Sequence, residues 1–154
     1  MKAKINPPPK HPGAGIAGLT DGELGEPNDL RLGWMGFRGA DLDATIDLGK
    51  ETPLHSVKVN FLQLISGGIV LPREIELAVS DDGKAFHTVA TQQIDLPMKG
   101  DASSQLSVNP LKLSTKDVSC RYLRFRAKSI GKLPPWHPAA GSPAWLFVDE
   151  LVVN

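Results

Sequence analysis

The sequence lacks the features of a disulfide-stabilised protein, of a membrane protein and of a protein with a large net charge. Cys120 is its only cysteine, so no disulfide can form within the chain, and we expect this residue to be buried rather than reactive. No apolar run approaches the roughly 18 residues of a membrane span, and residues 1–9 lack the apolar core of a signal peptide. Because 17 Lys and Arg residues balance 17 Asp and Glu residues, no net field favours nucleic acid or an anionic membrane.

Recognisable catalytic motifs are also missing. The sequence contains no Gly-x-Ser-x-Gly elbow, phosphate loop or dinucleotide fingerprint. Its histidines do not have the spacing of zinc ligands; they are His11, His55, His87 and His137. The adjacent acids Asp149 and Glu150 lie in an apolar segment, where strand alternation predicts opposite faces rather than a hydrolase pair. We expect no catalysis by this chain itself.

The residues that are abundant indicate an all-β fold. Proline occurs 13 times and glycine 15 times, and both punctuate short alternating or apolar segments. Turns are expected at 49–53 and 81–83, and strands at 43–48, 55–62, 74–80, 86–90, 106–113, 121–127 and 144–153. No window has convincing helical periodicity. The pattern predicts seven to nine short strands in an all-β sandwich or jelly roll.

The start of the chain differs in composition from the rest. Residues 1–15 contain Pro7, Pro8, Pro9 and Pro12, which favour an extended linker. We therefore predict a linker at 1–15 and one folded domain at 16–154. A segment this rich in proline suggests a module excised from a longer protein.

The aromatic and basic residues give few binding candidates. Trp136 and His137 lie between Pro134-Pro135 and Pro138, so they are expected in a loop, where an aromatic face suits a sugar. A structural role for Trp136 is equally compatible with the sequence, and we expect Trp34 and Trp145 in the core. Alternation places Arg124, Arg126 and Lys128 on one face, which favours a solvated strand face over an anion site.

A calcium site is the second binding candidate. Gly18-Leu-Thr-Asp-Gly22 is a turn that offers the carboxylate of Asp21 and exposed backbone carbonyls, both suited to calcium. If the first and last strands are neighbours, Asp21 and one of Asp149 or Glu150 share the ion. The alternative is a surface Asx-turn with a solvent-facing acid.

Six segments, taken in order, resemble a known family. They are Leu19-Thr-Asp-Gly22, Trp34-Met-Gly-Phe37, residues 41–49, Val79-Ser-Asp-Asp-Gly-Lys84, Arg121-Tyr-Leu-Arg124 and the stretch from Trp136 to Glu150. Over residues 16–154 the chain resembles the discoidin-like domain, also called F5/8 type C and similar to carbohydrate-binding module family 32. The resemblance is closest to the module at the C-terminus of bacterial family 20 β-N-acetylhexosaminidases.

This resemblance implies a jelly-roll β-sandwich of about eight antiparallel strands, with its two termini close together and a structural calcium ion near them. By position, Asp21 and Glu150 match the side-chain ligands, backbone carbonyls near Leu19 and Val148 assist, and Asp149 faces the other way. Sugar-binding relatives hold their ligand on loops at one end of the sandwich. The resemblance also implies an exported protein, extracellular or periplasmic, and a monomeric module.

Two functional hypotheses follow. In the first, the domain is a non-catalytic accessory module that binds glycans containing N-acetylhexosamine or galactose weakly, through Trp136 and His137. In the second, it packs on the catalytic domain or another protein and binds no sugar. Related hexosaminidase modules have a tryptophan in the loop after Phe61-Leu-Gln63, where this chain has Ser66-Gly-Gly68, and this difference favours the second hypothesis.

Overall fold

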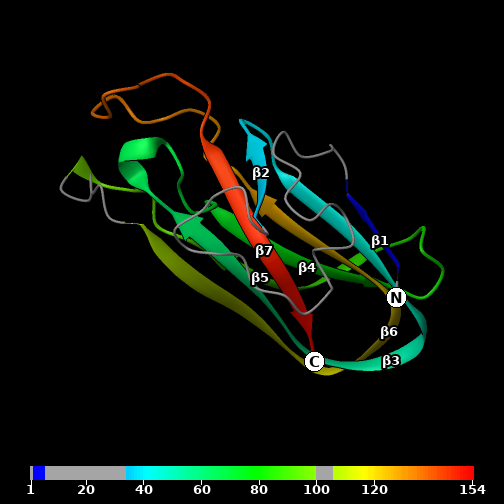
Figure 1. The fold of residues 1–154 in the computed structure, drawn as a ribbon. Coiled ribbons are helices and arrows are strands. Elements are labelled where there is room, and N and C mark those ends of the chain that lie inside the picture. The colour runs from blue at the N-terminus through cyan, green and yellow to red at the C-terminus, as the bar shows by residue number, and fades with distance from the viewer. Residues whose placement is uncertain (1, 6–33, 100–105) are drawn as a thin grey trace.

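The computed structural model describes residues 2–5, 34–99 and 106–154, which form an almost entirely β structure (Figure 1). Within these ranges no helix is long and apolar enough to cross a membrane. The elements are β1 (Lys2–Ile5), β2 (Met35–Arg38), β3 (Leu42–Gln63), the 3-10 helix η2 (Ile65–Gly67), β4 (Glu74–Ser80), β5 (His87–Gln93), β6 (Ser107–Lys128) and β7 (Trp145–Val153).

The strands pair antiparallel in the order β2-β7-β3-β6-β4-β5, and β1 pairs with β3. The long strands β3 and β6 bend midway and contribute to two layers (Figure 1). One layer contains β1, β4 and β5 with the 42–47 and 122–127 segments of the long strands. The other layer contains β2 and β7 together with residues 56–63 of β3 and residues 107–114 of β6. The predicted all-β sandwich is confirmed.

The bend in β3 replaces the turn that the sequence predicts at 49–53. The pairing with β6 shifts register between Asp47 and Thr52, and again between Leu54 and Ser56. Gly49 has a φ of +88°, and its N–H donates to Asp47 Oδ1 at 2.8 Å. A glycine is suited to this left-handed conformation. The strand thus passes from one layer to the other and keeps β6 as its partner on both sides of the bend.

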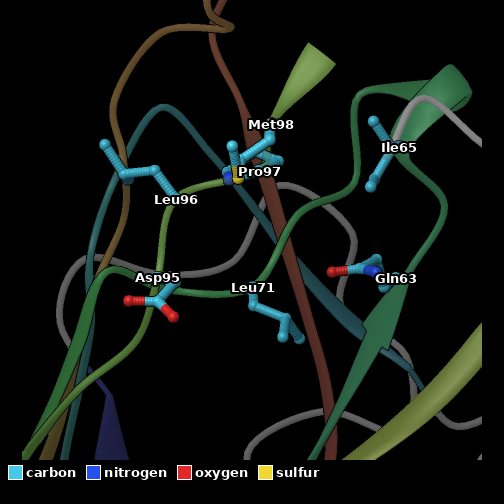
Figure 2. A pocket seen from close by; sticks show the side chains of 7 residues that line it. All are labelled: Gln63, Ile65, Leu71, Asp95, Leu96, Pro97 and Met98. Atoms are coloured by element: carbon cyan, nitrogen blue, oxygen red, sulfur yellow. The ribbon is translucent and has the colours of Figure 1, made fainter. Parts of the chain in front are cut away.

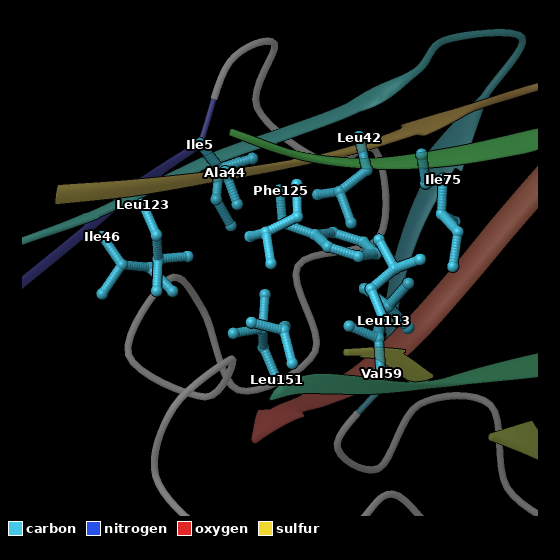
Figure 3. Close-up of a cluster of buried hydrophobic side chains, with 14 of the residues drawn as sticks. Ile5, Leu42, Ala44, Ile46, Val59, Ile75, Leu113, Leu123, Phe125 and Leu151 are labelled. Carbon is cyan, nitrogen blue, oxygen red and sulfur yellow. The ribbon is translucent and has the colours of Figure 1, made fainter. Parts of the chain in front are cut away.

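The core lies between the two layers. Its side chains come from alternate positions of the strands, since every second residue points inward. Leu42, Ala44 and Ile46 point inward from β3, while Asp43 and Thr45 between them are partly exposed. The predicted apolar face of β6 is also confirmed, because Leu123 and Phe125 are fully buried. Figure 3 shows side chains from both layers meeting in one cluster, including Ile5, Leu42, Ala44, Ile46, Val59, Ile75, Leu113, Leu123, Phe125 and Leu151.

Three basic residues of β6 lie on the outer face of the sandwich, where they pair with acids on neighbouring strands. Register partners form two of the ion pairs, Arg126–Asp43 at 3.0 Å and Lys128–Glu74 at 2.9 Å. A third pair joins Arg121 to Asp47 at 3.0 Å, and the carboxylate raises the pKa of the Arg121 guanidinium. Exposed pairs of this kind contribute little to stability, because water and salt screen the charges. Arg126 and Lys128 lie on a solvated strand face, as the sequence predicts, whereas the guanidinium of Arg124 packs over the Phe86 ring.

The beginning of the chain is part of the sandwich. Residues 2–5, which the composition assigns to a linker, form β1 and pair with residues 44–47 of β3. Ile5 is 7% exposed and belongs to the main core. The short alternation that places Ile5 inward was obscured by the proline-rich residues after it, which lie outside the described ranges.

The predicted turn after β4 is confirmed at Asp81–Gly83. Asp82 Oδ1 accepts hydrogen bonds from the N–H groups of Lys84 at 2.8 Å and Ala85 at 3.0 Å, and from the Ser80 hydroxyl at 2.9 Å. These bonds favour the charged carboxylate, so the pKa of Asp82 is lowered. The turn fixes the β4–β5 hairpin at the edge of the sheet.

Candidate functional site

Three connecting segments gather at one end of the sandwich. They are the η2 segment after β3, the segment around Leu96 after β5, and the long loop 130–143 between β6 and β7 (Figure 1). β1 and the C-terminal end of β7 lie away from this cluster. Loops presented by a rigid sandwich are where binding residues are most often found. We call this region the loop end.

The loop 130–143 is held in shape by its own backbone. Leu133 N–H donates to Ser142 O at 2.9 Å, and Gly141 N–H donates to Leu133 O at 3.1 Å. His137 N–H donates to Pro134 O at 3.0 Å, which closes a turn around Pro135 and Trp136. Proline also restricts its own φ and the conformation of the residue before it. Trp136 is therefore presented on a preorganised backbone.

His137 anchors this loop to the η2 segment. Its side chain is only 4% exposed. Nδ1 accepts a hydrogen bond from Ala139 N–H at 2.9 Å, which leaves the proton on Nε2, and Nε2 then donates to Ile65 O at 2.5 Å. Both ring nitrogens are thus used within the protein. His137 positions the loop, and the exposed aromatic surface comes from its neighbour.

Trp136 lies at the boundary between a small core and a groove. One part of its side chain packs on the cluster formed by Ile65, Val70, Leu133 and Ala144, and it is only partly buried. The rest lines a groove of about 430 Å³. The other lining residues are Arg73, Leu96, Pro97, Ile130, Lys132, Pro134 and Pro135. An aromatic face with few polar groups in a concave site is the arrangement that binds small organic ligands such as sugars.

A second hollow lies on the other side of the 130–143 loop. Its volume is about 270 Å³, and Ser66, Gly67 and Gly68 line it together with His137 and Trp145. Gly68 has a φ of +77°, and its carbonyl accepts a hydrogen bond from Trp145 N–H at 2.9 Å. This Ser-Gly-Gly segment therefore lines an open hollow with no large side chain of its own.

A third hollow, of about 410 Å³, lies behind Leu96 (Figure 2). It is lined by Gln63, Ile65, Leu71, Asp95, Leu96, Pro97 and Met98, and so shares Leu96 and Pro97 with the Trp136 groove. Leu96 is 59% exposed and Met98 is 71% exposed. The rim of the loop end thus carries apolar side chains in contact with solvent.

The expected calcium residues are only partly within the described ranges. Leu19 and Asp21 lie outside them, and the side chain of Glu150 is not described. Val148 is buried, and its backbone pairs with Met35 of β2 and Phe61 of β3. Among residues 2–5, 34–99 and 106–154, no group of three His, Cys, Asp or Glu is placed to hold a metal ion.

The acids of β7 lie at an irregularity of the strand. Between the pairs Val59–Leu151 and Phe61–Val148, β3 advances two residues and β7 three, so β7 contains a bulge at Asp149 and Glu150. Val148 and Leu151 consequently both face the main core. Strict alternation therefore does not extend from Val148 to Leu151. Asp149 is 2% exposed, so the expectation of a solvent-facing acid is wrong for this residue.

The other singled-out side chains are mostly core residues. Trp34 is fully buried and packs with Leu62, Ile69 and Phe147, as predicted. Trp145 is partly buried against the same cluster, with its ring 5.4 Å from that of Phe147. Cys120 is fully buried, and burial raises the pKa of its thiol, which agrees with an unreactive core residue.

Sequence reasoning missed most of the Trp136 groove. Arg73 precedes β4, Lys132 follows β6, and Leu96 follows β5. These positions are brought together only by the sheet order, since the ends of β4, β5 and β6 are neighbours. No local motif marks any of the three, and only a correct strand order would have identified them.

Comparison with known proteins identifies the class of this domain. The chain matches the F5/8 type C domain profile over residues 7–148 and belongs to this family. The discoidin-like assignment made from the six segments is thereby confirmed at the level of the family. No curated protein sequence gives a match.

Solved structures with this fold include several carbohydrate-binding modules. A family 32 module from Clostridium perfringens, in complex with GalNAc-β-1,3-galactose, has a TM-score of 0.57 at 18% identity over 99% of this chain and 93% of that one. The family 32 module of AlyQ, in complex with 4,5-unsaturated mannuronic acid, has a TM-score of 0.58 at 15% identity over 100% and 94%. The C-terminal domain of a chitobiase from Bacteroides fragilis has a TM-score of 0.57 at 14% identity over 99% and 92%. At these identities the likeness establishes the fold.

Proposed function

We propose that this domain is a non-catalytic carbohydrate-binding module that holds a sugar in the groove beside Trp136. The observation that carries the proposal is the partly exposed indole on a hydrogen-bonded loop, lining a groove of about 430 Å³. Stacking a sugar ring on such a face costs little conformational entropy of the protein, because the loop is already fixed. The sugar complexes of the structurally similar modules support this function.

We further propose that the module is the C-terminal accessory domain of an exported bacterial β-N-acetylhexosaminidase. The support is the resemblance of the six sequence segments, together with the similar fold of a chitobiase C-terminal domain. The parent enzyme would hydrolyse terminal N-acetylhexosamine at an active site outside this chain, in an extracellular or periplasmic location. The module would then hold glycans containing N-acetylhexosamine or galactose near that site.

The test is a titration of the isolated domain with N-acetylglucosamine, galactose and GalNAc-β-1,3-galactose, followed by NMR. Saturable binding in the millimolar range is expected, with the largest shift at the Trp136 indole N–H. Absence of binding by every sugar at high millimolar concentration would exclude the carbohydrate-binding role and favour the alternative.

That alternative is a structural domain that packs on the catalytic domain or on another protein. The exposed side chains of Leu96 and Met98 favour it, because adjacent large apolar residues at a rim often mark protein contacts. The Ser66-Gly67-Gly68 segment, with no aromatic platform, points the same way.

A structural calcium ion is the third part of the proposal. β7 is paired with β2 only as far as Val148, and its bulge at Asp149 and Glu150 interrupts the ladder with β3. Such a bulge releases a backbone carbonyl from pairing, and carbonyls with carboxylates are the ligands that calcium prefers. This local chemistry fits the ion. Asp21 and Glu150, with carbonyls near Leu19 and Val148, would hold it and tie the last strand to the early turn.

Removing calcium is therefore expected to destabilise the domain. With calcium at about 100 times its dissociation constant, binding contributes about 2.7 kcal/mol. Chelation should then lower Tm by roughly 5 to 10 °C for a chain of this size. Thermal melts with and without chelator, followed by circular dichroism, measure the shift.

The matched variants are Glu150→Ala and Asp95→Ala. Glu150→Ala should remove the difference between the two melts, and Asp21→Ala should do the same. Asp95, an exposed acid at the loop end, should leave the difference unchanged when replaced. A wild-type Tm that does not respond to chelator and added calcium would exclude the ion.

A further inference from the structure

Among the residues that the structure describes, the groove beside Trp136 is lined by two positive charges and no negative one. Arg73 and Lys132 line it, and its remaining lining residues are uncharged. Both basic side chains are exposed. Two acids are adjacent in the chain to lining residues: Glu74, which is paired with Lys128 at 2.9 Å, and Asp95, which lines the neighbouring hollow beyond Leu96 (Figure 2).

Arg73 is held firmly at the edge of the groove. Its N–H donates to Lys128 O at 2.8 Å, and its carbonyl accepts from Ile94 N–H at 2.9 Å, so the residue is fixed between the ends of β6 and β5. Its Nε donates to Ser129 O at 3.3 Å. Within the described ranges, its terminal nitrogens form no hydrogen bond or ion pair. The side chain is thus positioned by the fold and keeps donors for a ligand.

Lys132 is placed by the 130–143 loop. Its backbone forms an isolated antiparallel β-bridge with Pro143 across the loop, and its N–H donates to Ile130 O at 3.1 Å. No carboxylate in the described part of the chain pairs with its ammonium group. It therefore adds an unneutralised charge on the same strip of loop that carries Trp136.

The two residues contrast with three basic residues of β6. Arg121, Arg126 and Lys128 are each paired with an acid at 2.9 to 3.0 Å. No ion pair of this kind neutralises Arg73 or Lys132 within the described part of the chain. A guanidinium group that retains free N–H donors suits the oxygens of a carboxylate, or of a similar anion.

We propose that the groove selects a sugar bearing a negatively charged group. In this arrangement the pyranose ring stacks on Trp136, and its carboxylate or sulfate lies between Arg73 and Lys132. The inference rests on the proposed carbohydrate-binding function and adds the class of sugar. Lone neutral monosaccharides would then bind the same groove, but more weakly.

The experiment compares matched acidic and neutral ligands by NMR titration and calorimetry. The first pair is an oligogalacturonate and its neutral methyl ester; the second is galactose 6-sulfate and galactose. The acidic member of at least one pair should bind about fivefold or more tightly, as expected for one exposed charge interaction. The pair in which this occurs distinguishes a carboxylate from a sulfate ligand. Added salt should reduce the preference.

The variants Arg73→Gln and Lys132→Gln should each lower acidic-ligand affinity and leave neutral-ligand affinity nearly unchanged. Lys132→Gln removes no side-chain hydrogen bond among the described residues. This variant therefore tests the charge inference even if Arg73→Gln is unstable. Lys116→Gln, at an exposed position in β6, removes the same charge elsewhere and should have no effect. Equal affinity within both ligand pairs would overturn the charge inference and leave carbohydrate binding intact. Failure of all four ligands to bind would overturn the charge inference, and failure of N-acetylglucosamine and GalNAc-β-1,3-galactose as well would overturn carbohydrate binding.

Discussion

Replacing Trp136 by alanine is expected to weaken sugar binding about 30-fold, which takes millimolar affinities out of the measurable range. Truncating an aromatic residue at the centre of a binding site commonly costs about 2 kcal/mol or more, which corresponds to this factor. The loop should keep its shape in the variant, because its hydrogen bonds are formed by the backbone and by His137. NMR titration with the best glycan ligand measures the change.

Phe86→Ala is the matched control for Trp136→Ala. Phe86 is also partly exposed, but it lies on the outer face, where the Arg124 guanidinium is 4.7 Å from its ring centroid. Its loss should leave sugar affinity unchanged. If Trp136→Ala binds sugar like the wild type while its spectrum is native, the groove is not the binding site.

Replacing Phe125 by alanine is expected to have the largest effect on stability. Phe125 is fully buried in the main core, and its register partners in β3 and β4 are Ala44 and Leu77 (Figure 3). Loss of a buried phenylalanine side chain costs about 3–5 kcal/mol, through lost burial and the cavity that remains. Tm should therefore fall by roughly 6 to 20 °C. Urea and thermal unfolding measure both quantities.

Val152→Ala provides the comparison. Val152 is also a strand residue, but it is 39% exposed, so the change should stay within about 0.5 kcal/mol of the wild type. Equal stabilities of the two variants would contradict the described core. At a temperature where Phe125→Ala is folded, its sugar affinity should match the wild type, because Phe125 lines none of the three hollows at the loop end.

Local alternation was sufficient to predict much of the sandwich. The inward faces at Leu123 and Phe125, the 74–80 strand and the turn at Asp81–Gly83 all follow from patterns within a few residues. The continuity of β3 through residues 49–53 could not be predicted from such local patterns. Gly49 and Pro53 are turn residues in isolation, and only the pairing of both halves with the distant β6 keeps this segment in one strand.

The candidate site was less predictable, for a related reason. The prolines around Trp136 indicate a loop from the sequence alone, but the hydrogen bond from His137 to Ile65 joins residues far apart in the chain. Arg73 and Lys132 reach the groove through the sheet order. The bulge at Asp149 and Glu150 depends on the register with β3, which local sequence does not encode.

The passage of β3 and β6 through both layers has a consequence for how the domain unfolds. Each layer contains half of the same two strands, so neither layer separates without breaking the pairing that supports the other. The domain should therefore behave as one cooperative unit. The closing contacts, such as Leu42 with Ala127, join distant parts of the chain, and this high contact order slows folding.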